Sequence, residues 1–350
     1  MTQDADLDPV AWTLQRHDEA PLRLTFRATT EPDALRWQDD LRAKLADLLG
    51  GFPQPRQRTA LSPSRTAIQD SATYVRETVV FNSRPGVAVL VHVLTPKQGA
   101  APFATVVCIP GHGRGADEIA GIGAMPEEDG SQPFALEAVR HGLAAVAIEP
   151  MGFGRRRDPM TRERGAGHTA CEPVAGSALL LGETLTGWRV WDVMRTVDYI
   201  RTRPDLDAHR IGCVGFSGGG TCALFAAALD QRIACAYVSG CLGTFRESIM
   251  RQAHCIDNYV PGVLGWAELY DIAGLIAPRP LFCESGESDP LFPAAAAREC
   301  FGKVEHVYTV MGAQGRAQLQ SFDGGHRFHG GRGWPFVASA LAGVQIRSPH

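Results

Sequence analysis

The residues Ile211-Gly-Cys-Val-Gly-Phe-Ser217-Gly-Gly-Gly220 carry an apolar run directly into a glycine-rich turn. The run predicts a buried strand, and the small apolar residues at 218–229 predict a helix inside the molecule. Ser217 lies between them in a Gly-x-Ser-x-Gly pattern, which holds a serine hydroxyl on a tight, strained turn above a sheet edge. Gly215 and Gly219 let strand and helix approach without Cβ clashes. We therefore predict that Ser217 is a nucleophile. The alternative is an ordinary glycine-rich turn, and the spacing of phosphate-binding loops is absent.

A series of short apolar runs predicts a largely parallel sheet. The runs alternate with helical or loop segments, which is typical of strands buried on both faces. They cover residues 104–109, 143–148, 211–214, 233–238, 280–283 and 304–310. Upstream, residues 74–81 and 87–94 are rich in β-branched residues and predict a hairpin. We expect an α/β fold with a mostly parallel central sheet, an N-terminal antiparallel hairpin and helices on both faces, among them one at 187–203.

The first 73 residues differ from the rest of the chain. Residues 34–49 carry an apolar stripe at helical spacing, which ends at Gly50-Gly51. Residues 50–73 are rich in Pro, Ser and Thr and favour a linker. We therefore predict an N-terminal helical arm and linker at 1–73, followed by a catalytic domain at 74–350.

The composition argues against several classes of protein. The 350 residues carry a formal net charge of −4, and 45% of them are hydrophobic. Such a chain can bury a core unaided, and the charge argues against nucleic acid as a partner because phosphate binding needs clustered Lys and Arg. No run reaches the roughly 20 apolar residues of a membrane span. The acidic N-terminus lacks the features of a secretory signal, so we expect a cytoplasmic protein without a membrane partner. A homo-oligomer remains open.

The nine cysteines do not form a recognisable framework. None belongs to a Cys-x-x-Cys pair, and most lie in apolar runs such as Ala234-Cys-Ala236. This usage is typical of buried thiols in a reducing compartment, in place of disulfides or zinc ligands. We expect no metal and no cofactor.

A serine nucleophile needs a base, and the base needs an orienting carboxylate. Residues 280–293 pass from an apolar strand into a polar turn, and Asp289 lies just past the strand end. Ligand-facing residues of parallel sheets collect at such ends, so we predict Asp289 as the carboxylate. The competing residues are Glu284, expected within the strand, and Glu287, expected to be solvated. A turn-capping role is the alternative for Asp289.

Two histidines lie on the glycine-rich segment Ser321-Phe-Asp-Gly-Gly-His326-Arg-Phe-His329-Gly-Gly, after the last predicted strand. We predict His326 as the base, with His329 as the alternative. A His-x-x-His pair could also chelate a metal, but two ligands on a loop make only half a site. His92 lies within a predicted strand and is expected to be a core or cross-strand residue.

Together these motifs resemble the α/β-hydrolases, in particular the branch of dienelactone-hydrolase-like and acetyl-xylan-esterase-like serine esterases. The resemblance covers about residues 74–345 and includes Asp271-Ile-Ala-Gly-Leu-Ile-Ala-Pro-Arg-Pro280. It implies the chain order Ser217, Asp289, His326, and ester hydrolysis through an acyl-enzyme without a cofactor. Dienelactone hydrolases proper use a cysteine nucleophile, and the arm is longer than a minimal hydrolase needs. Both departures concern the substrate.

The same resemblance assigns a role to the turn Pro110-Gly-His-Gly-Arg-Gly115. Turns of this type supply one N–H of the oxyanion hole, and the residue after the nucleophile supplies the other. We predict the backbone N–H groups of Gly218 and His112, with Gly113 as the alternative to His112. The side chain of His112 is expected to shape the pocket.

Two insertions, at about 152–182 and 240–278, are expected to cover the site. The first contains five arginines at 155–164, interpreted as a solvated face or as a recognition element for an acidic substrate. The second forms either an aromatic wall or ordinary packing. Its aromatic residues are Phe245, Tyr259, Trp266 and Tyr270. The predicted substrate-binding residues are Phe216, Trp266 and His254.

These predictions combine into a serine hydrolase of small-molecule carboxylic esters, with acetyl esters as candidates. Ser217 is the predicted nucleophile, His326 the general base and then acid, and Asp289 the group that orients His326. Three alternatives stay open at this point. They are amide or peptide hydrolysis on the same triad, a non-catalytic ligand-binding protein on a hydrolase scaffold, and a metallohydrolase.

Overall fold

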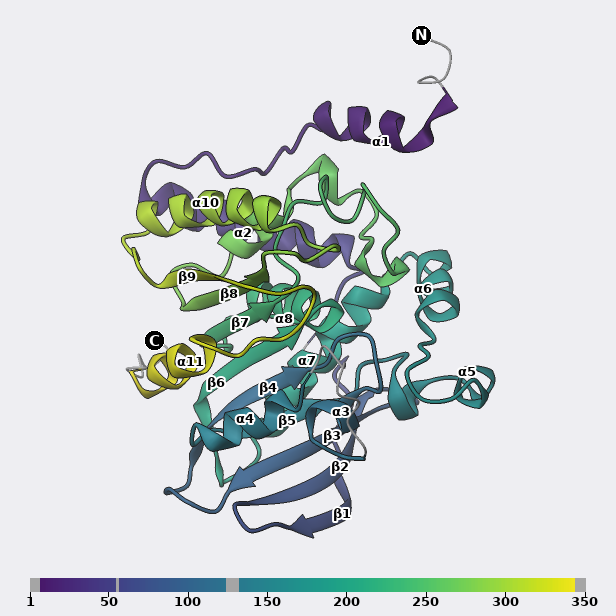
Figure 1. Cartoon of the computed structure of the whole chain (residues 1–350), viewed down its shortest axis with the longest axis vertical. Coiled ribbons are helices and arrows are strands. Elements are labelled where there is room, and N and C mark those ends of the chain that lie inside the picture. The colour runs from purple at the N-terminus through teal and green to yellow at the C-terminus, as the bar shows by residue number, and fades with distance from the viewer. Residues whose placement is uncertain (1–6, 55–56, 124–131, 344–350) are drawn as a thin grey trace.

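The computed structural model describes residues 7–54, 57–123 and 132–343 (Figure 1). The acidic residues 1–6, on which the expectation about a secretory signal rests, lie outside these ranges. The strands are β1 (Ser64–Asp70), β2 (Tyr74–Arg84), β3 (Val87–Pro96), β4 (Phe103–Ile109), β5 (Ala144–Ile148), β6 (Leu206–Phe216), β7 (Cys235–Ser239), β8 (Leu281–Gly286) and β9 (Ala317–Phe322). The helices are α1 (Pro9–Asp18), α2 (Glu31–Leu48), α3 (Ala116–Ile119), α4 (Phe134–Arg140), α5 (Pro159–Glu163), α6 (Cys171–Leu180), α7 (Leu185–Ile200), α8 (Gly218–Leu229), α9 (Leu269–Gly274), α10 (Ala294–Val310) and α11 (Gly333–Ala342), with short 3-10 turns η3 (Gly154–Arg156), η4 (Ile256–Asn258) and η5 (Val263–Gly265).

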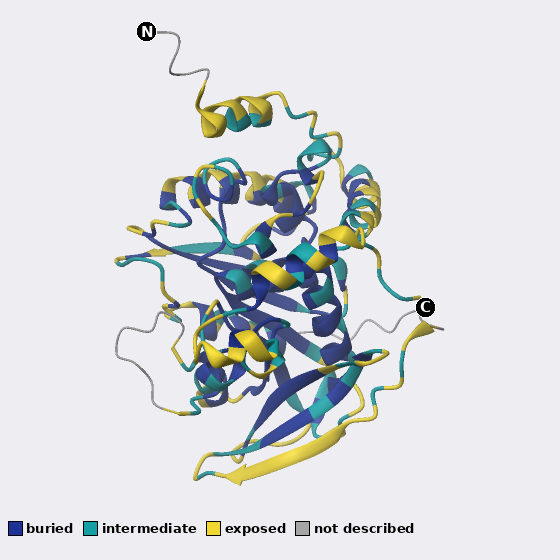
Figure 2. Cartoon of the chain, turned by 90° about the vertical axis from the view of Figure 1, so that its right-hand side faces the viewer, coloured by how far each residue is buried: buried dark blue, intermediate teal, exposed yellow. Residues whose placement is uncertain are grey.

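The described strands form one mixed sheet in the order β1-β2-β3-β5-β4-β6-β7-β8-β9. The pairs β1–β2, β2–β3 and β3–β5 are antiparallel, and every pair from β5–β4 onward is parallel. The predicted hairpin is therefore present as β2 and β3, with Phe81 opposite Val89. The central strands are buried on both faces, which explains their continuous apolar runs (Figure 2).

Helices pack on both faces of the sheet, as predicted. Helices α2, α7, α8, α9 and α10 share one hydrophobic cluster with one face. Helices α3, α4 and α11 share a second cluster with the other face. The small side chains of α8 fit their place between strands and outer helices, because nine of its twelve residues are buried.

The two outermost strands differ from the predictions. Residues 304–310, predicted as the last strand, belong to helix α10, whose buried side chains repeat at helical spacing. The last strand is β9, whose central residues are only partly buried. Likewise β1 lies inside the predicted linker, and all seven of its residues are exposed. Edge strands with so few buried residues carry no apolar run, so the sequence pattern does not reveal them.

The predicted N-terminal arm contacts the rest of the described chain through α2 and through residues 17–24. This helix buries Trp37, Leu41 and Leu45 against the cluster that contains α10. Gln38 donates a hydrogen bond to the Ala277 carbonyl at 2.7 Å. Helix α1, which the sequence did not predict, has no buried residue and projects from the body of the molecule (Figure 1).

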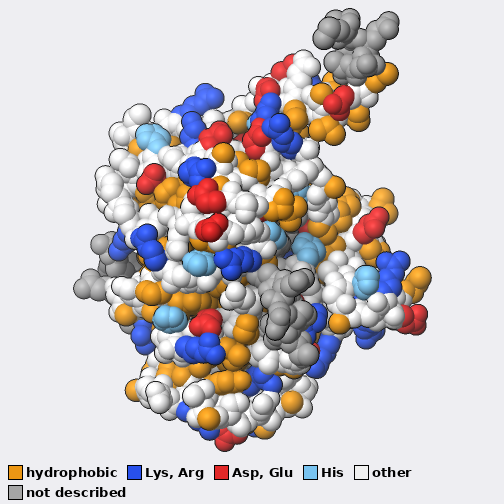
Figure 3. All heavy atoms as spheres, in the orientation of Figure 1, with side chains coloured by type: hydrophobic (Ala, Val, Ile, Leu, Met, Phe, Trp, Pro, Cys, Tyr) orange, Lys and Arg blue, Asp and Glu red, His pale blue; other side chains and the backbone are white. Residues whose placement is uncertain are grey.

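The surface charges and the helices can be compared with the expectations about nucleic-acid and membrane partners. On the face drawn in Figure 3, cationic and anionic side chains are interspersed. Among the described residues, no helix combines the length and apolarity that a bilayer crossing requires.

Candidate active site

Ser217 occupies a sharp turn between β6 and α8. Its φ of 53° and ψ of −125° lie in a region that side-chain-bearing residues rarely adopt. Its backbone N–H donates to the Ser239 carbonyl at 2.8 Å, which anchors the turn to β7. A Cβ atom on Gly215 would lie 2.1 Å from the Gly219 carbonyl oxygen, so this approach of strand and helix requires glycine. The motif therefore forms the predicted strand–turn–helix.

The structure brings Ser217, His326 and Asp289 together from the ends of three strands. His326 Nε2 lies 2.8 Å from the Ser217 hydroxyl oxygen, and His326 Nδ1 lies 2.8 Å from Asp289 Oδ2. The other oxygen of Asp289 accepts the backbone N–H groups of Leu291 and Phe292, at 2.8 and 3.0 Å. Asp289 is buried, so its carboxylate is fixed by these partners and not by water. In such a series of hydrogen bonds, the histidine can take a proton from the serine hydroxyl.

The competing acids and the second histidine have other partners. Glu284 is fully buried within β8 and accepts hydrogen bonds from the Ser239 hydroxyl and the His329 backbone N–H. Glu287 is exposed and forms an ion pair with Arg298 at 3.0 Å. The ring of His329 stacks on Phe322, with 4.6 Å between ring centroids. Both acids therefore lie where the sequence placed them, in the strand and at the surface.

His92 also has the structural surroundings that were expected. It is buried on β3, opposite Thr78 of β2. One ring nitrogen contacts the Thr78 hydroxyl at 3.0 Å and the other contacts Asp117 at 2.7 Å.

A cavity of about 330 Å³ lies beside Ser217. Phe216 and His254, two of the predicted substrate-binding residues, line it together with Phe292 and His326. Burial lowers the pKa of His254. The structure corrects the prediction for Trp266, whose ring packs beneath Arg23 and Lys44 of the arm. The ring of Trp266 is thus used to hold the arm, outside the cavity lining.

The cavity also reaches the predicted oxyanion groups. Gly218, the first residue of α8, and His112, from the turn after β4, both line it. A Cβ atom on Gly218 would lie 2.8 Å from His112 Cε1, and one on Gly111 would lie 3.2 Å from Ser217 Cβ. The turn after β4 therefore packs directly on the serine turn. The N-terminus of α8 carries a partial positive charge on the same side.

The side chain of His112, at the wall of the cavity, belongs to an ionic cluster that the sequence did not reveal. Its Nε2 lies 3.0 Å from Asp257 Oδ2 and 3.6 Å from Cys171 Sγ. Burial opposes a charge on the imidazole, but the hydrogen bonds with Asp257 and Cys171 outweigh it and raise the pKa of His112 to about 9. Arg189, which is buried beneath them, forms an ion pair with Asp257 and donates to Cys171 Sγ at 3.1 Å. No local spacing connects these residues, so only the fold shows them together.

In each of the two insertions, the structure agrees with one of the two alternatives that the sequence left open. In the first, Arg156 is nearly buried and pairs with Asp192 at 2.7 Å, while Arg157 donates to backbone carbonyls within its own loop. These two arginines hold the insertion in place, whereas Arg155, Arg162 and Arg164 are exposed, as the predicted solvated face requires. In the second, the aromatic-wall prediction is wrong, because the residues of that segment that line the cavity are Ala253, His254, Cys255 and Asn258.

Comparison with known proteins places this architecture in a family. The sequence profile described as the Abhydrolase family matches residues 16–318. The chain belongs to the abhydrolase family. This abhydrolase is 28% identical to YtaP of Bacillus subtilis (strain 168), described as a hydrolase, over 78% of this chain and 88% of YtaP. The predicted α/β-hydrolase fold is thereby confirmed.

Solved structures share the fold of this abhydrolase at low sequence identity. One is a Bacteroides fragilis protein described as an acetyl xylan esterase, with a TM-score of 0.76 and 20% identity, covering 90% of this chain and 82% of the other. Another is a glucuronoyl esterase from Solibacter usitatus, with a TM-score of 0.65 and 16% identity, covering 88% of this chain and 93% of the other.

Proposed function

We propose that this abhydrolase is a serine hydrolase of small-molecule carboxylic esters, and that short acyl groups such as acetyl are its substrates. The proposal rests on one observation above all. Beside a cavity, Ser217, His326 and Asp289 form a continuous chain of hydrogen bonds with 2.8 Å at each step.

Each group in the chain has a defined part in the reaction. Ser217 Oγ attacks the ester carbonyl carbon while His326 Nε2 accepts the hydroxyl proton, and Asp289 stabilises the resulting imidazolium. The backbone N–H groups of Gly218 and His112 donate to the oxyanion of the tetrahedral intermediate. His326 then returns the proton to the leaving alcohol. Water, activated by the same histidine, releases the acid from the acyl-enzyme.

The size of the cavity supports a small acyl group. A volume of about 330 Å³ lies at the lower end of the range for ligand pockets, about 300–1,000 Å³. Phe216, Leu291 and Phe292 supply its apolar lining. The names of the two similar solved structures are those of ester hydrolases, which supports an ester over an amide.

The test is hydrolysis of p-nitrophenyl acetate by the purified protein. Ser217→Ala is expected to lower kcat/KM by at least about 10³-fold, because it removes the nucleophile. Ser177→Ala, which changes an exposed serine of α6, is the matched control and is expected to leave turnover unchanged. The corresponding acetanilide is expected to react far more slowly. If folded Ser217→Ala hydrolyses the ester as fast as the wild type, the proposal is wrong. If the wild type hydrolyses the anilide faster than the ester, the substrate class is amides and not esters.

A further inference from the structure

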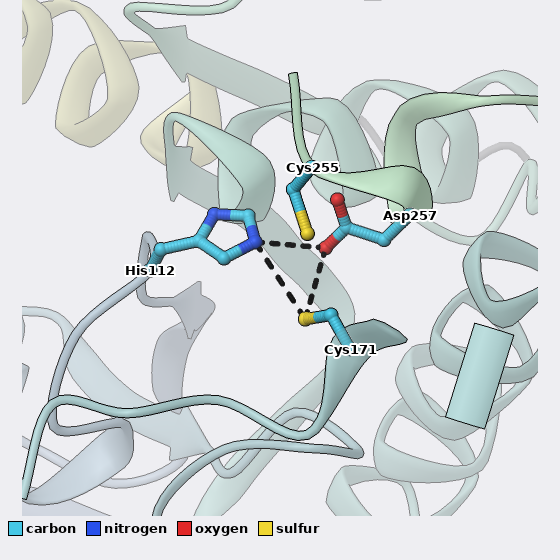
Figure 4. Close-up of side chains that lie close together, drawn as sticks. All are labelled: His112, Cys171, Cys255 and Asp257. Carbon is cyan, nitrogen blue, oxygen red and sulfur yellow. Dashed lines mark hydrogen bonds and ion pairs between the residues drawn. The ribbon is translucent and has the colours of Figure 1, made fainter. Parts of the chain in front are cut away.

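Four side chains of metal-ligating type meet beside the cavity, and the serine chemistry does not use them (Figure 4). His112 comes from the turn after β4, and Cys171 is the first residue of α6. Cys255 precedes η4, and Asp257 lies within it. One ligand atom from each residue lies within 4.8 Å of the other three. The fold thus brings two thiols, an imidazole and a carboxylate to one point.

Two of the separations among these atoms match those of a tetrahedral zinc site, and all of them lie within 4.8 Å. With Zn–S near 2.3 Å and Zn–N or Zn–O near 2.0 Å, neighbouring ligand atoms of a tetrahedron lie about 3.3–3.8 Å apart. His112 Nε2 and Cys171 Sγ are 3.6 Å apart, and Cys171 Sγ and Asp257 Oδ2 are also 3.6 Å apart. His112 Nε2 and Asp257 Oδ2 are 3.0 Å apart, slightly closer than a bound ion would hold them. Movements of about 1 Å, including one of Cys255, would bring all four atoms to the spacing of zinc ligands.

The charges around the cluster also suit a divalent cation. Two thiolates and one carboxylate carry three negative charges, and Zn²⁺ together with the Arg189 guanidinium carries three positive charges. Arg189 is buried, donates to Cys171 Sγ and forms an ion pair with Asp257, and outer partners of metal ligands make contacts of this kind. Its other contacts, to the Met151 carbonyl at 3.0 and 2.8 Å, hold it in that position. Cys255 lines the cavity, which provides a path for an ion to enter.

We propose that His112, Cys171, Cys255 and Asp257 form a structural zinc site. A mixed sulfur and nitrogen donor set selects zinc over magnesium or calcium. Four protein ligands leave no open position, so the ion would not activate water. It would instead link the turn after β4, the start of α6 and η4, which together surround the cavity. The proposal does not depend on the esterase activity, since metal binding is measured without a substrate.

Cobalt substitution is the most direct test of the site. The reduced, metal-free protein is titrated with Co²⁺ and followed by absorption spectroscopy. We expect one equivalent to give a thiolate-to-cobalt charge-transfer band in the near ultraviolet and the strong visible bands of tetrahedral cobalt, both of which added Zn²⁺ abolishes. Cys171→Ala and Cys255→Ala are each expected to lose these bands. Cys235→Ala, a buried thiol of β7 outside the cluster, is the matched control and is expected to keep them.

Thermal unfolding supplies a second readout. Zinc is expected to raise the Tm of the wild type and of Cys235→Ala, and to leave that of Cys255→Ala unchanged, because only an intact site binds the folded state. Wild-type protein that shows no cobalt bands while its thiols stay reduced would overturn the proposal, leaving a metal-free ionic cluster around Arg189. Cobalt bands that persist in both cysteine variants would overturn it as well.

Discussion

Two histidine–carboxylate pairs border the same cavity, and they differ in which ring nitrogen the carboxylate contacts. Asp289 contacts Nδ1 of His326, so Nε2 is left for the Ser217 hydroxyl. Asp257 contacts Nε2 of His112, the nitrogen that also faces Cys171. The first pair can pass a proton between serine and substrate through Nε2. In the second pair, Nε2 already contacts both Asp257 and Cys171. Under the proposed function, the same two residue types would serve proton transfer in one place and structure in the other.

The surroundings of the two carboxylates show the same contrast. Asp289 is held by backbone N–H groups, which fix its position without adding a formal charge. Asp257 faces the buried guanidinium of Arg189, and together with His112 this partner holds the pKa of Asp257 well below its usual range. A catalytic carboxylate must stay available to its histidine, whereas a structural carboxylate can share its charge among several cations.

The largest expected effect is the difference in kcat between variants of the two histidines. His326→Ala is expected to lower kcat for p-nitrophenyl acetate by about 10⁴-fold or more, because the serine loses its base. His112→Ala keeps the backbone N–H and the Ser217–His326 contact, so its loss of kcat should be smaller by at least about 10²-fold. Steady-state kinetics of both folded variants measure this difference. Equal losses would place His112 in the proton transfer.

Variants of the two carboxylates are expected to differ in their free energy of unfolding. Asp257→Asn in metal-free protein leaves the buried Arg189 with less compensating charge, and is expected to lower the free energy of unfolding by about 3 kcal/mol. Asp289→Asn disturbs no buried arginine, so we expect a smaller loss of stability and a large loss of kcat. Urea unfolding followed by circular dichroism measures the first quantity. A more stable Asp257→Asn protein would show that the ionic cluster opposes folding.

Glu149 is a further buried carboxylate, which contacts no histidine among the described residues, and its ionisation makes the stability of the protein depend on pH. Burial raises its pKa to about 7, with Asp117 adding to the effect, while the N–H groups of Ala116 and Arg155 and the charge of Arg156 oppose it. Below pH 4.5 this group is protonated in both the folded and the unfolded state. Between pH 4.5 and 7 it ionises only in the unfolded state, so the free energy of unfolding falls as the pH rises. The wild type should therefore lose about 3 kcal/mol relative to Glu149→Gln across this range. The measurement is urea unfolding of both proteins at a series of pH values, and parallel stability curves would contradict the assignment.

The parts of the molecule that could be predicted from the sequence are those that a short stretch of neighbouring residues determines. The serine turn, the buried strands and the hairpin each depend on a short pattern of glycines or apolar residues. Asp289 followed from its position after a buried strand. His326 followed from its glycine-rich segment and from the order that the family resemblance supplied, since the strand directly before it, β9, was not predicted. The edge strands β1 and β9 were missed because a strand with one neighbour buries little and needs no apolar run.

The remaining parts depend on contacts between distant residues. Val304, Val307 and Tyr308 fit a strand by composition, but packing of α10 against the arm and the sheet makes them helical. Trp266 carries no sign in the sequence that its ring holds the arm. His112, Cys171 and Asp257 come from separate segments, so their meeting is a product of the tertiary fold alone.

The central claim is that Ser217 is the reactive nucleophile of this cavity. The direct measurement is covalent labelling with a fluorophosphonate, followed by intact mass and peptide mapping. We predict one adduct per chain, located on Ser217 and absent from Ser217→Ala and His326→Ala. An adduct on another residue, or no adduct on the folded wild-type protein, would contradict the account.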